Sequence, residues 1–186
     1  ALTPVAPTHF AAITDPKDIG PFLRKLHGYE GTRVVMSALR LAPLVFVRPG
    51  ELRQAQWLDM KLDAAKPQWE FIATKTHTPH IVPLATQAVA ILRALHPHTS
   101  HQPFVFPGPR NGRPMSGNAL AAAMRAMGIP KETMSVHGFL ALVGDEFGDA
   151  VGGAEGHAQG AAGITDGGFG TQGTEGDDLR DAIVAI

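Results

Sequence analysis

The chain has 186 residues, a formal net charge of −1 and 44% hydrophobic residues, enough for one globular domain with its own core. It contains no cysteine, which excludes disulfide bonds and thiolate metal sites and fits a reducing compartment such as the cytoplasm. No apolar run approaches the roughly 20 residues that a membrane-spanning helix needs, so we expect a cytoplasmic protein without a membrane partner.

Charge and composition change together near residue 139. Residues 1–139 hold 15 Lys and Arg against 8 Asp and Glu, whereas residues 140–186 hold 1 against 9. All 15 prolines lie in the first part, and 12 of the 21 glycines lie in the second. We therefore expect a core over residues 1–139, basic enough to meet a polyanion, followed by a Gly/Asp-rich acidic tail over residues 140–186.

The first half of the chain predicts two helices behind a short leader. Residues 1–14 contain Pro4 and Pro7, which argue against a helix there. Asp15 is typical of an N-cap before a helix that ends at Gly28. A second helix is expected from about Thr32 to Val47.

Arg48 directly follows the apolar end of that second helix. Pro49 suits the first position of a new helix, which we expect to reach about Trp57, and Glu51 then lies in the first turn, where a negative charge is favourable. Arg48 should therefore occupy a joint between two helices and present a fixed guanidinium, which suits phosphate oxygens. The alternative is an arginine that pairs with Glu51 or caps a carbonyl.

The rest of the first part predicts a small sheet and further helices. Alternating patterns and turn residues indicate antiparallel strands, and helical spacing returns after them. We expect strands at residues 57–63, 68–73 and 80–84, a helix at 86–95, a loop at 97–113 with an extended piece at 104–106, a helix from Ser116 to Gly128, and a helix beginning at His137.

Two further residues could carry chemistry. Lys75 is expected at a turn between strands, where it is either simply solvated or a mobile ammonium that donates a proton or binds phosphate. His137 is either a core or capping histidine, or a general base or phosphate contact, and Gly138 after it would let another backbone come close. Arg48, Lys75 and His137 together favour phosphoryl transfer without a metal or another cofactor.

The sequence resembles the tyrosine recombinases, and most closely the phage integrases of the P4-like group. The resemblance covers residues 9–139 and implies an α+β fold, a mainly helical catalytic domain with a small three-stranded antiparallel sheet. It also implies that the chain begins at the catalytic domain, without the arm-binding and core-binding domains. The matching motifs are residues 39–52 (LRLAPLVFVRPGEL), 74–84 (TKTHTPHIVPL), 105–107 (VFP), 111–116 (NGRPMS) and 137–139 (HGF).

The resemblance assigns a role to each candidate residue. Arg48 matches the first catalytic arginine, which clamps the scissile phosphate of double-stranded DNA at an attachment site. Lys75 matches the lysine that protonates the departing 5′-oxygen, and His137 matches the histidine of the His-x-x-Arg box. In the family a tyrosine then attacks DNA to give a 3′-phosphotyrosine link, which a 5′-hydroxyl resolves without metal or ATP.

The chain departs from the family after His137. Leu140 stands where the box requires its arginine, the single tyrosine, Tyr29, lies far upstream, and the surroundings of His157 do not match the family. We therefore expect a fragment that is catalytically inactive and monomeric in isolation. An out-of-frame reading of GC-rich DNA would produce a tail of this composition, and we treat that origin as a hypothesis.

Two alternatives remain open at this point. The chain could be a non-catalytic DNA-binding regulator that kept the recombinase fold. It could also bind a metal through its histidines, which we disfavour because no carboxylate accompanies them. The histidines concerned are His77, His80, His96, His98 and His101.

Overall fold

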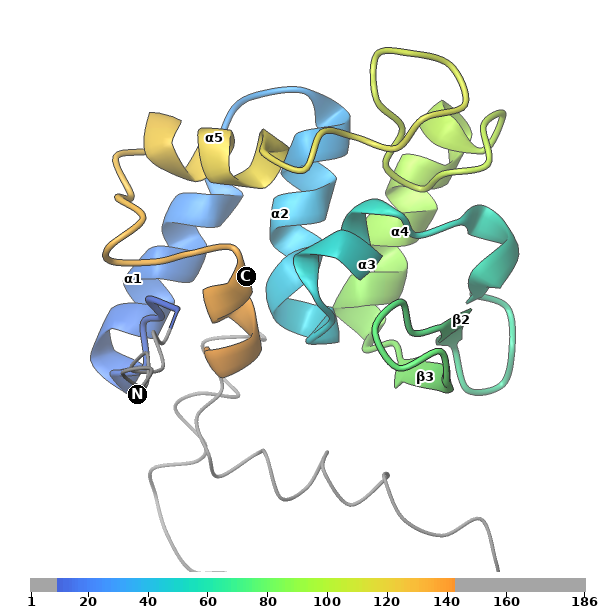
Figure 1. Ribbon diagram of the computed structural model, residues 1–186, viewed down its shortest axis with the longest axis horizontal. Coiled ribbons are helices and arrows are strands. Elements are labelled where there is room, and N and C mark those ends of the chain that lie inside the picture. The colour runs from blue at the N-terminus through green and yellow to red at the C-terminus, as the bar shows by residue number, and fades with distance from the viewer. Residues whose placement is uncertain (1–9, 143–186) are drawn as a thin grey trace, which may run out of the picture.

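The computed structural model describes residues 10–142, so residues 1–9 of the leader and residues 143–186 of the tail, with His157, lie outside the described part. Within that part the fold is α+β, as expected, with helices packed around α2 and a small sheet to one side (Figure 1). The α-helices are α1 (Pro16–His27), α2 (Arg33–Val45), α3 (Pro49–Arg53), α4 (Thr86–Thr99) and α5 (Ala119–Ala126). The remaining elements are the 3₁₀ helices η1 (Trp57–Asp59) and η2 (His137–Ala141) and the strands β1 (Met60–Lys61), β2 (Gln68–Ile72) and β3 (Pro79–Pro83).

Local capping explains where the first two helices begin. The Asp15 side chain accepts a hydrogen bond from the Lys17 backbone N–H at 3.2 Å, and the Thr32 hydroxyl accepts one from the Val35 N–H at 3.4 Å. Each bond satisfies a backbone donor that has no partner inside the helix. Both predicted starts are confirmed.

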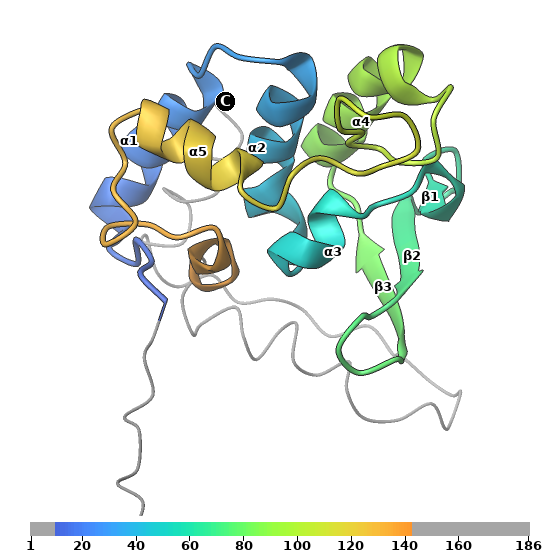
Figure 2. The same cartoon turned by 45° about the horizontal axis from the view of Figure 1, so that its top comes forward.

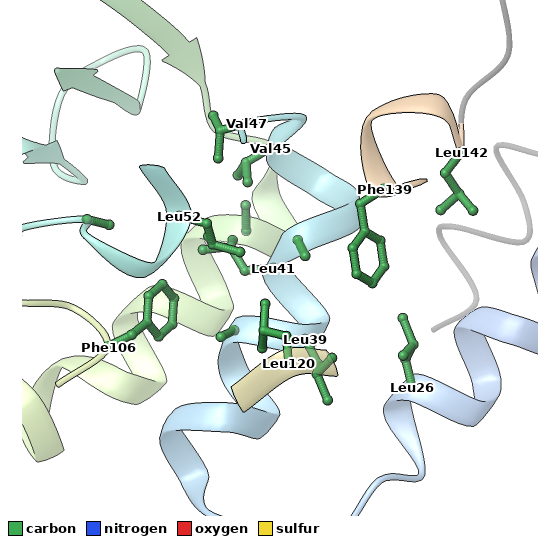
Figure 3. Packing of buried hydrophobic residues seen from close by; sticks show 14 of the residues in the cluster. Leu26, Leu39, Leu41, Val45, Val47, Leu52, Phe106, Leu120, Phe139 and Leu142 are labelled. Atoms are coloured by element: carbon green, nitrogen blue, oxygen red, sulfur yellow. The ribbon is translucent and has the colours of Figure 1, made fainter. Parts of the chain in front are cut away.

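Helix α2 is the centre of the hydrophobic core. It contacts α1, α3, α4, α5 and η2, and its Leu39 and Leu41 are fully buried. Leu52 of α3 lies on one side of α2, and Phe139 of η2 lies on the other (Figure 3). The elements that carry Arg48 and His137 are thus both held by the same helix.

The helix α2 ends at Val45, two residues before the predicted end. Phe46 adopts a left-handed conformation with φ of 48°, which bulky residues rarely accept. The left-handed conformation of Phe46 ends the helix, and the next residue, Val47, lies in the core, where it is 7% exposed. Arg48, the next residue, is exposed.

Helix α3 is shorter than predicted because its continuation pairs with a distant segment. The Ala55 carbonyl accepts a hydrogen bond from the Val105 N–H at 2.8 Å, and the Trp57 N–H donates to the Pro103 carbonyl at 3.0 Å. Trp57 also begins the 3₁₀ helix η1, so the strand predicted over residues 57–63 is present only at Met60–Lys61. The expected extended piece at residues 104–106 is the partner in this pairing.

The sheet confirms the expected meander, with strand order β1-β2-β3 and antiparallel pairs. Trp69 of β2 lies opposite Val82 of β3, and both are buried. Because side chains alternate along a strand, this pair marks the face that packs on the core. The β2–β3 turn lies at the end of the sheet away from the β1–β2 turn (Figure 2).

Two later helices differ from the prediction at their ends. Helix α4 continues through Pro97 to Thr99, whereas we expected a loop from residue 97. Helix α5 begins at Ala119 instead of directly after Ser116, although the Ser116 hydroxyl does accept a hydrogen bond from the Asn118 N–H at 3.3 Å. The stop at Gly128 is confirmed, with φ of 72°.

Candidate functional site

Arg48 lies at the joint between α2 and α3, as the N-cap residue of α3. Its backbone N–H donates to Glu51 Oε2 at 3.0 Å and its guanidinium Nη1 donates to Glu51 Oε1 at 3.2 Å. The Arg48 side chain is 48% exposed and that of Glu51 only 5%. Both expectations therefore hold together, because Arg48 pairs with Glu51 and still presents part of a fixed guanidinium to solvent.

Glu51 is a positioning residue for Arg48, a role that the sequence does not predict. The sequence predicts only a favourable first-turn charge or a competing partner for the arginine. A buried carboxylate is costly unless it is paired, and Glu51 satisfies that need through the backbone and side chain of the same arginine. The signal that could have identified this arrangement is a glutamate three residues after the N-cap, the spacing at which its side chain reaches back to the N-cap N–H.

Lys75 lies in the exposed turn between β2 and β3, as predicted. The turn is closed by hydrogen bonds from the His77 N–H to the Ala73 carbonyl at 2.8 Å and from the Ala73 N–H to the Thr78 carbonyl at 2.9 Å. His77 has a positive φ of 56°. Within residues 10–142 the Lys75 ammonium makes no ion pair, so it extends into solvent from a defined turn.

His137 is the first residue of η2 and is exposed. Its ring stacks on that of Phe10, with centroids 4.3 Å apart and planes 13° apart. It is therefore not a core histidine. Its ring edges, which carry the two nitrogens, are not covered by the stack.

The elements that carry these three residues lie on one side of the molecule. In Figures 1 and 2, η2 and the β2–β3 turn occupy the same side, with the end of α2 and the start of α3 between them. The three elements that carry Arg48, Lys75 and His137 are far apart in the sequence, yet they lie on a common side of the molecule. Guanidinium, ammonium and imidazole groups there are donors suited to an anionic ligand.

Comparison with known proteins finds relatives of this chain among the integrases. The chain is 34% identical over 137 residues to the putative protein IntB of Escherichia coli K12, covering 66% of this chain and 35% of IntB. It is 30% identical over 166 residues to the integrase of Enterobacteria phage P4, covering 81% of this chain and 37% of that protein. No protein-family model matches.

Solved structures show the same fold. The XerH site-specific recombinase, in a post-cleavage complex with palindromic difH substrate, superposes with a TM-score of 0.57 at 14% identity, over 82% of this chain and 46% of that one. XerA recombinase gives 0.54 at 16% identity, over 84% and 55%. The chain carries a tyrosine recombinase catalytic domain. It spans about a third of the length of the curated relatives named above.

The recombinase domain has an exposed leucine three residues after His137. Leu140, on η2, is 42% exposed, although large apolar side chains are usually buried. The position has room for a longer polar side chain without disturbing the core. A guanidinium, which the resemblance requires at this position, is absent.

The described part of the recombinase domain offers neither a metal site nor a membrane span. No group of three His, Asp or Glu residues within residues 10–142 could hold a metal ion, so the histidine-based alternative is not supported. His80 and His96 instead contact aromatic rings, with centroid distances of 5.2 Å to Phe71 and 4.8 Å to Trp57. None of the helices described here is both long and apolar enough to cross a bilayer.

Proposed function

We propose that this chain is a phage-integrase-family catalytic-domain fragment that binds the double-stranded DNA of an attachment site, in the process of DNA integration and recombination. The observation that supports this most directly is the Arg48–Glu51 pair, which holds a half-exposed guanidinium at a fixed joint. We further propose that the protein acts in the cytoplasm, away from membranes, and is a monomer in isolation.

In this proposal each site residue meets the DNA backbone. Arg48 clamps a phosphate, His137 contacts the same group, and Lys75 reaches it from the β2–β3 turn. Charge-assisted hydrogen bonds to phosphate position a protein on DNA without reading its sequence. The support is the family relationship together with the exposure of all three residues, whose elements lie on one side of the fold.

The fragment is proposed to be unable to cut DNA as it stands. Leu140 cannot act as the second phosphate clamp, and the chain's one tyrosine, Tyr29, follows α1, where its backbone N–H donates to Leu26 at 3.3 Å. Without a nucleophile no covalent link to DNA can form. The division into a core over residues 1–139 and a frameshifted tail over residues 140–186 belongs to the same proposal, and sequencing the encoding gene tests it.

The test of DNA binding is a salt-dependent gel shift with a pool of random-sequence duplexes. Lys75→Ala should weaken binding and reduce the salt slope by about one phosphate contact. Lys66→Ala is the matched control, since Lys66 is exposed in the β1–β2 turn at the other end of the sheet. If the two variants lose the same amount of DNA affinity, the proposed DNA-binding side of the molecule is wrong.

The same design applies to Arg48→Ala, with Arg93→Ala as control, because Arg93 of α4 is an exposed arginine that also pairs with an acidic residue, Asp63.

Catalysis is tested separately with nicked suicide duplexes. We expect no covalent protein–DNA adduct on a denaturing gel. A protease-sensitive adduct would overturn the proposed inactivity and leave the DNA-binding result standing.

A further inference from the structure

The segment from Phe10 to Ile13, here called the strap, lies against the residues around His137. The Ala11 carbonyl accepts hydrogen bonds from the backbone N–H of Ser135 at 2.9 Å and from its hydroxyl at 3.0 Å. The Ser135 hydroxyl in turn accepts from the Gly138 N–H at 3.0 Å. A continuous chain of hydrogen bonds therefore links the strap to the first turn of η2.

Gly138 is the residue that admits the strap. A Cβ atom built there would collide with the Ala11 carbonyl oxygen and would lie 3.1 Å from Ala12 Cα and 3.0 Å from Met134 Sδ. The sequence indicated that Gly138 would let another backbone approach, and that backbone belongs to the strap. Two of the three contacts are with backbone atoms, which cannot move aside as a side chain can.

Phe10 is the strap residue that reaches the histidine. It is 64% exposed, so core burial does not account for its position, yet its ring is stacked on the imidazole of His137. A ring on one face restricts how the imidazole can rotate and leaves its nitrogen-bearing edges available. Stacking of this kind supplies orientation with little burial.

We propose that Phe10 is a positioning residue that orients the His137 imidazole toward a DNA phosphate, and that the strap holds Phe10 in place. The proposal rests on the proposed function, because it takes the ligand of His137 to be a phosphate oxygen. Phe10 itself touches no ligand. It acts by restricting the rotation of the His137 ring before DNA binds, so that less side-chain entropy is lost on binding.

The first experiment observes the stack without DNA, using the full chain and the histidine ring protons in two-dimensional NMR. Phe10→Ala should move the His137 ring signals, because the ring current of Phe10 is lost, and Phe10→Tyr should retain them. Leu58→Ala removes another side chain that is 83% exposed and should leave them unchanged. His137→Ala assigns the signals. Unchanged His137 signals in Phe10→Ala would overturn the proposal.

The second experiment is a double-mutant cycle on duplex DNA affinity. Phe10→Ala should weaken binding by about 2- to 10-fold, the equivalent of one aromatic stack, and should have no further effect in a His137→Ala background. An equal loss in both backgrounds, or no loss in either, would overturn the positioning role. If His137→Ala alone leaves binding unchanged, the proposed role of His137 fails, whatever the NMR result for the stack.

Discussion

Arg48 and Glu51 form an ion pair at the joint between α2 and α3. An ion pair with one half-exposed partner contributes about 0–1 kcal/mol to stability, so the pair matters more for orientation than for folding. Among the described residues, Arg48 is the only one that donates hydrogen bonds to the Glu51 carboxylate. Arg48 uses its backbone N–H and one guanidinium nitrogen for these bonds. The other guanidinium nitrogens are the ones that we propose to bind a phosphate.

Leu140→Arg should increase DNA affinity. Leu140 is 42% exposed on η2, so an arginine there can stay hydrated and reach a phosphate near His137. One added phosphate contact should strengthen binding several-fold at low salt and steepen the salt dependence by about one unit. The gel shift described above measures both quantities.

The control for this change is Leu58→Arg, which adds the same charge at a residue that is 83% exposed on η1. If Leu58→Arg strengthens binding as much, the effect comes from net charge, and η2 does not face the DNA. Neither variant should form a covalent adduct, because neither supplies a nucleophile.

His27 should make the protein less stable in mild acid. Burial, and then the nearby Arg40 guanidinium, hold the pKa of His27 below its usual value of 6.5. The folded state therefore binds fewer protons than the unfolded state as the pH falls through this range, so stability is present above pH 6.5 and lost below it. Urea unfolding from about pH 7 to about pH 5 should show a smaller loss for His27→Gln than for the parent.

His101→Gln removes an exposed histidine and should keep the parental pH dependence. The assignment would be wrong if His27→Gln and the parent lost stability in parallel. Replacing the side chain leaves intact the hydrogen bond from Arg40 Nη2 to the His27 backbone carbonyl, at 2.7 Å, which simplifies the comparison.

Among the elements, α2 should respond most to a cavity. Leu41 is 0% exposed at the centre of the core, so Leu41→Ala should lower the free energy of unfolding by about 2–5 kcal/mol. Leu58→Ala, at an exposed position, should change it by less than about 0.5 kcal/mol. Urea denaturation of both variants decides whether the packing around α2 is as tight as the structure shows.

The helices that depend on local signals could be predicted from the sequence. Asp15 and Thr32 each cap a helix within three residues, and both starts were expected correctly. The predictions are wrong where contacts with a distant segment determine the end of a helix. Helix α4 passes Pro97 because the Thr99 hydroxyl accepts from Trp57 Nε1 and donates to the Val105 carbonyl, each at 3.2 Å, and no local pattern reports such partners.

For the candidate site, too, local sequence patterns predict positions along the chain but not contacts between distant segments. The motifs placed Arg48 at a joint, Lys75 in a turn and His137 at the start of a helix, and the structure agrees on these positions. Phe10 could not be linked to His137, because the two lie more than a hundred residues apart and the leader carries no periodic pattern. Their contact exists only once α1 and η2 are packed on α2.

At the level of the whole molecule, charge is separated along the chain. Residues 143–186 include nine acidic residues and one arginine, opposite in sign to the basic core. Removing these residues should strengthen DNA binding several-fold at low salt, because a repulsive charge is lost. The difference should shrink near 1 M salt, where screening is almost complete.

Filter binding at two salt concentrations measures this effect, with circular dichroism to verify that residues 1–142 keep their helical content. A difference that persists at high salt would mean that the tail acts by contact and not by charge. No difference at low salt would mean that the acidic residues lie too far from the DNA to oppose it.

Phe46 and His77 have a consequence for how such a domain can evolve. They are the only non-glycine residues with positive φ among the described ones, and each is separated by one residue from a proposed phosphate contact, Arg48 or Lys75. Left-handed conformations cost such residues about 1–3 kcal/mol. Glycine at either place would remove that cost and would also loosen the backbone beside the neighbouring cation. A domain of this kind can therefore gain stability at these two positions only by giving up a fixed direction for Arg48 or Lys75.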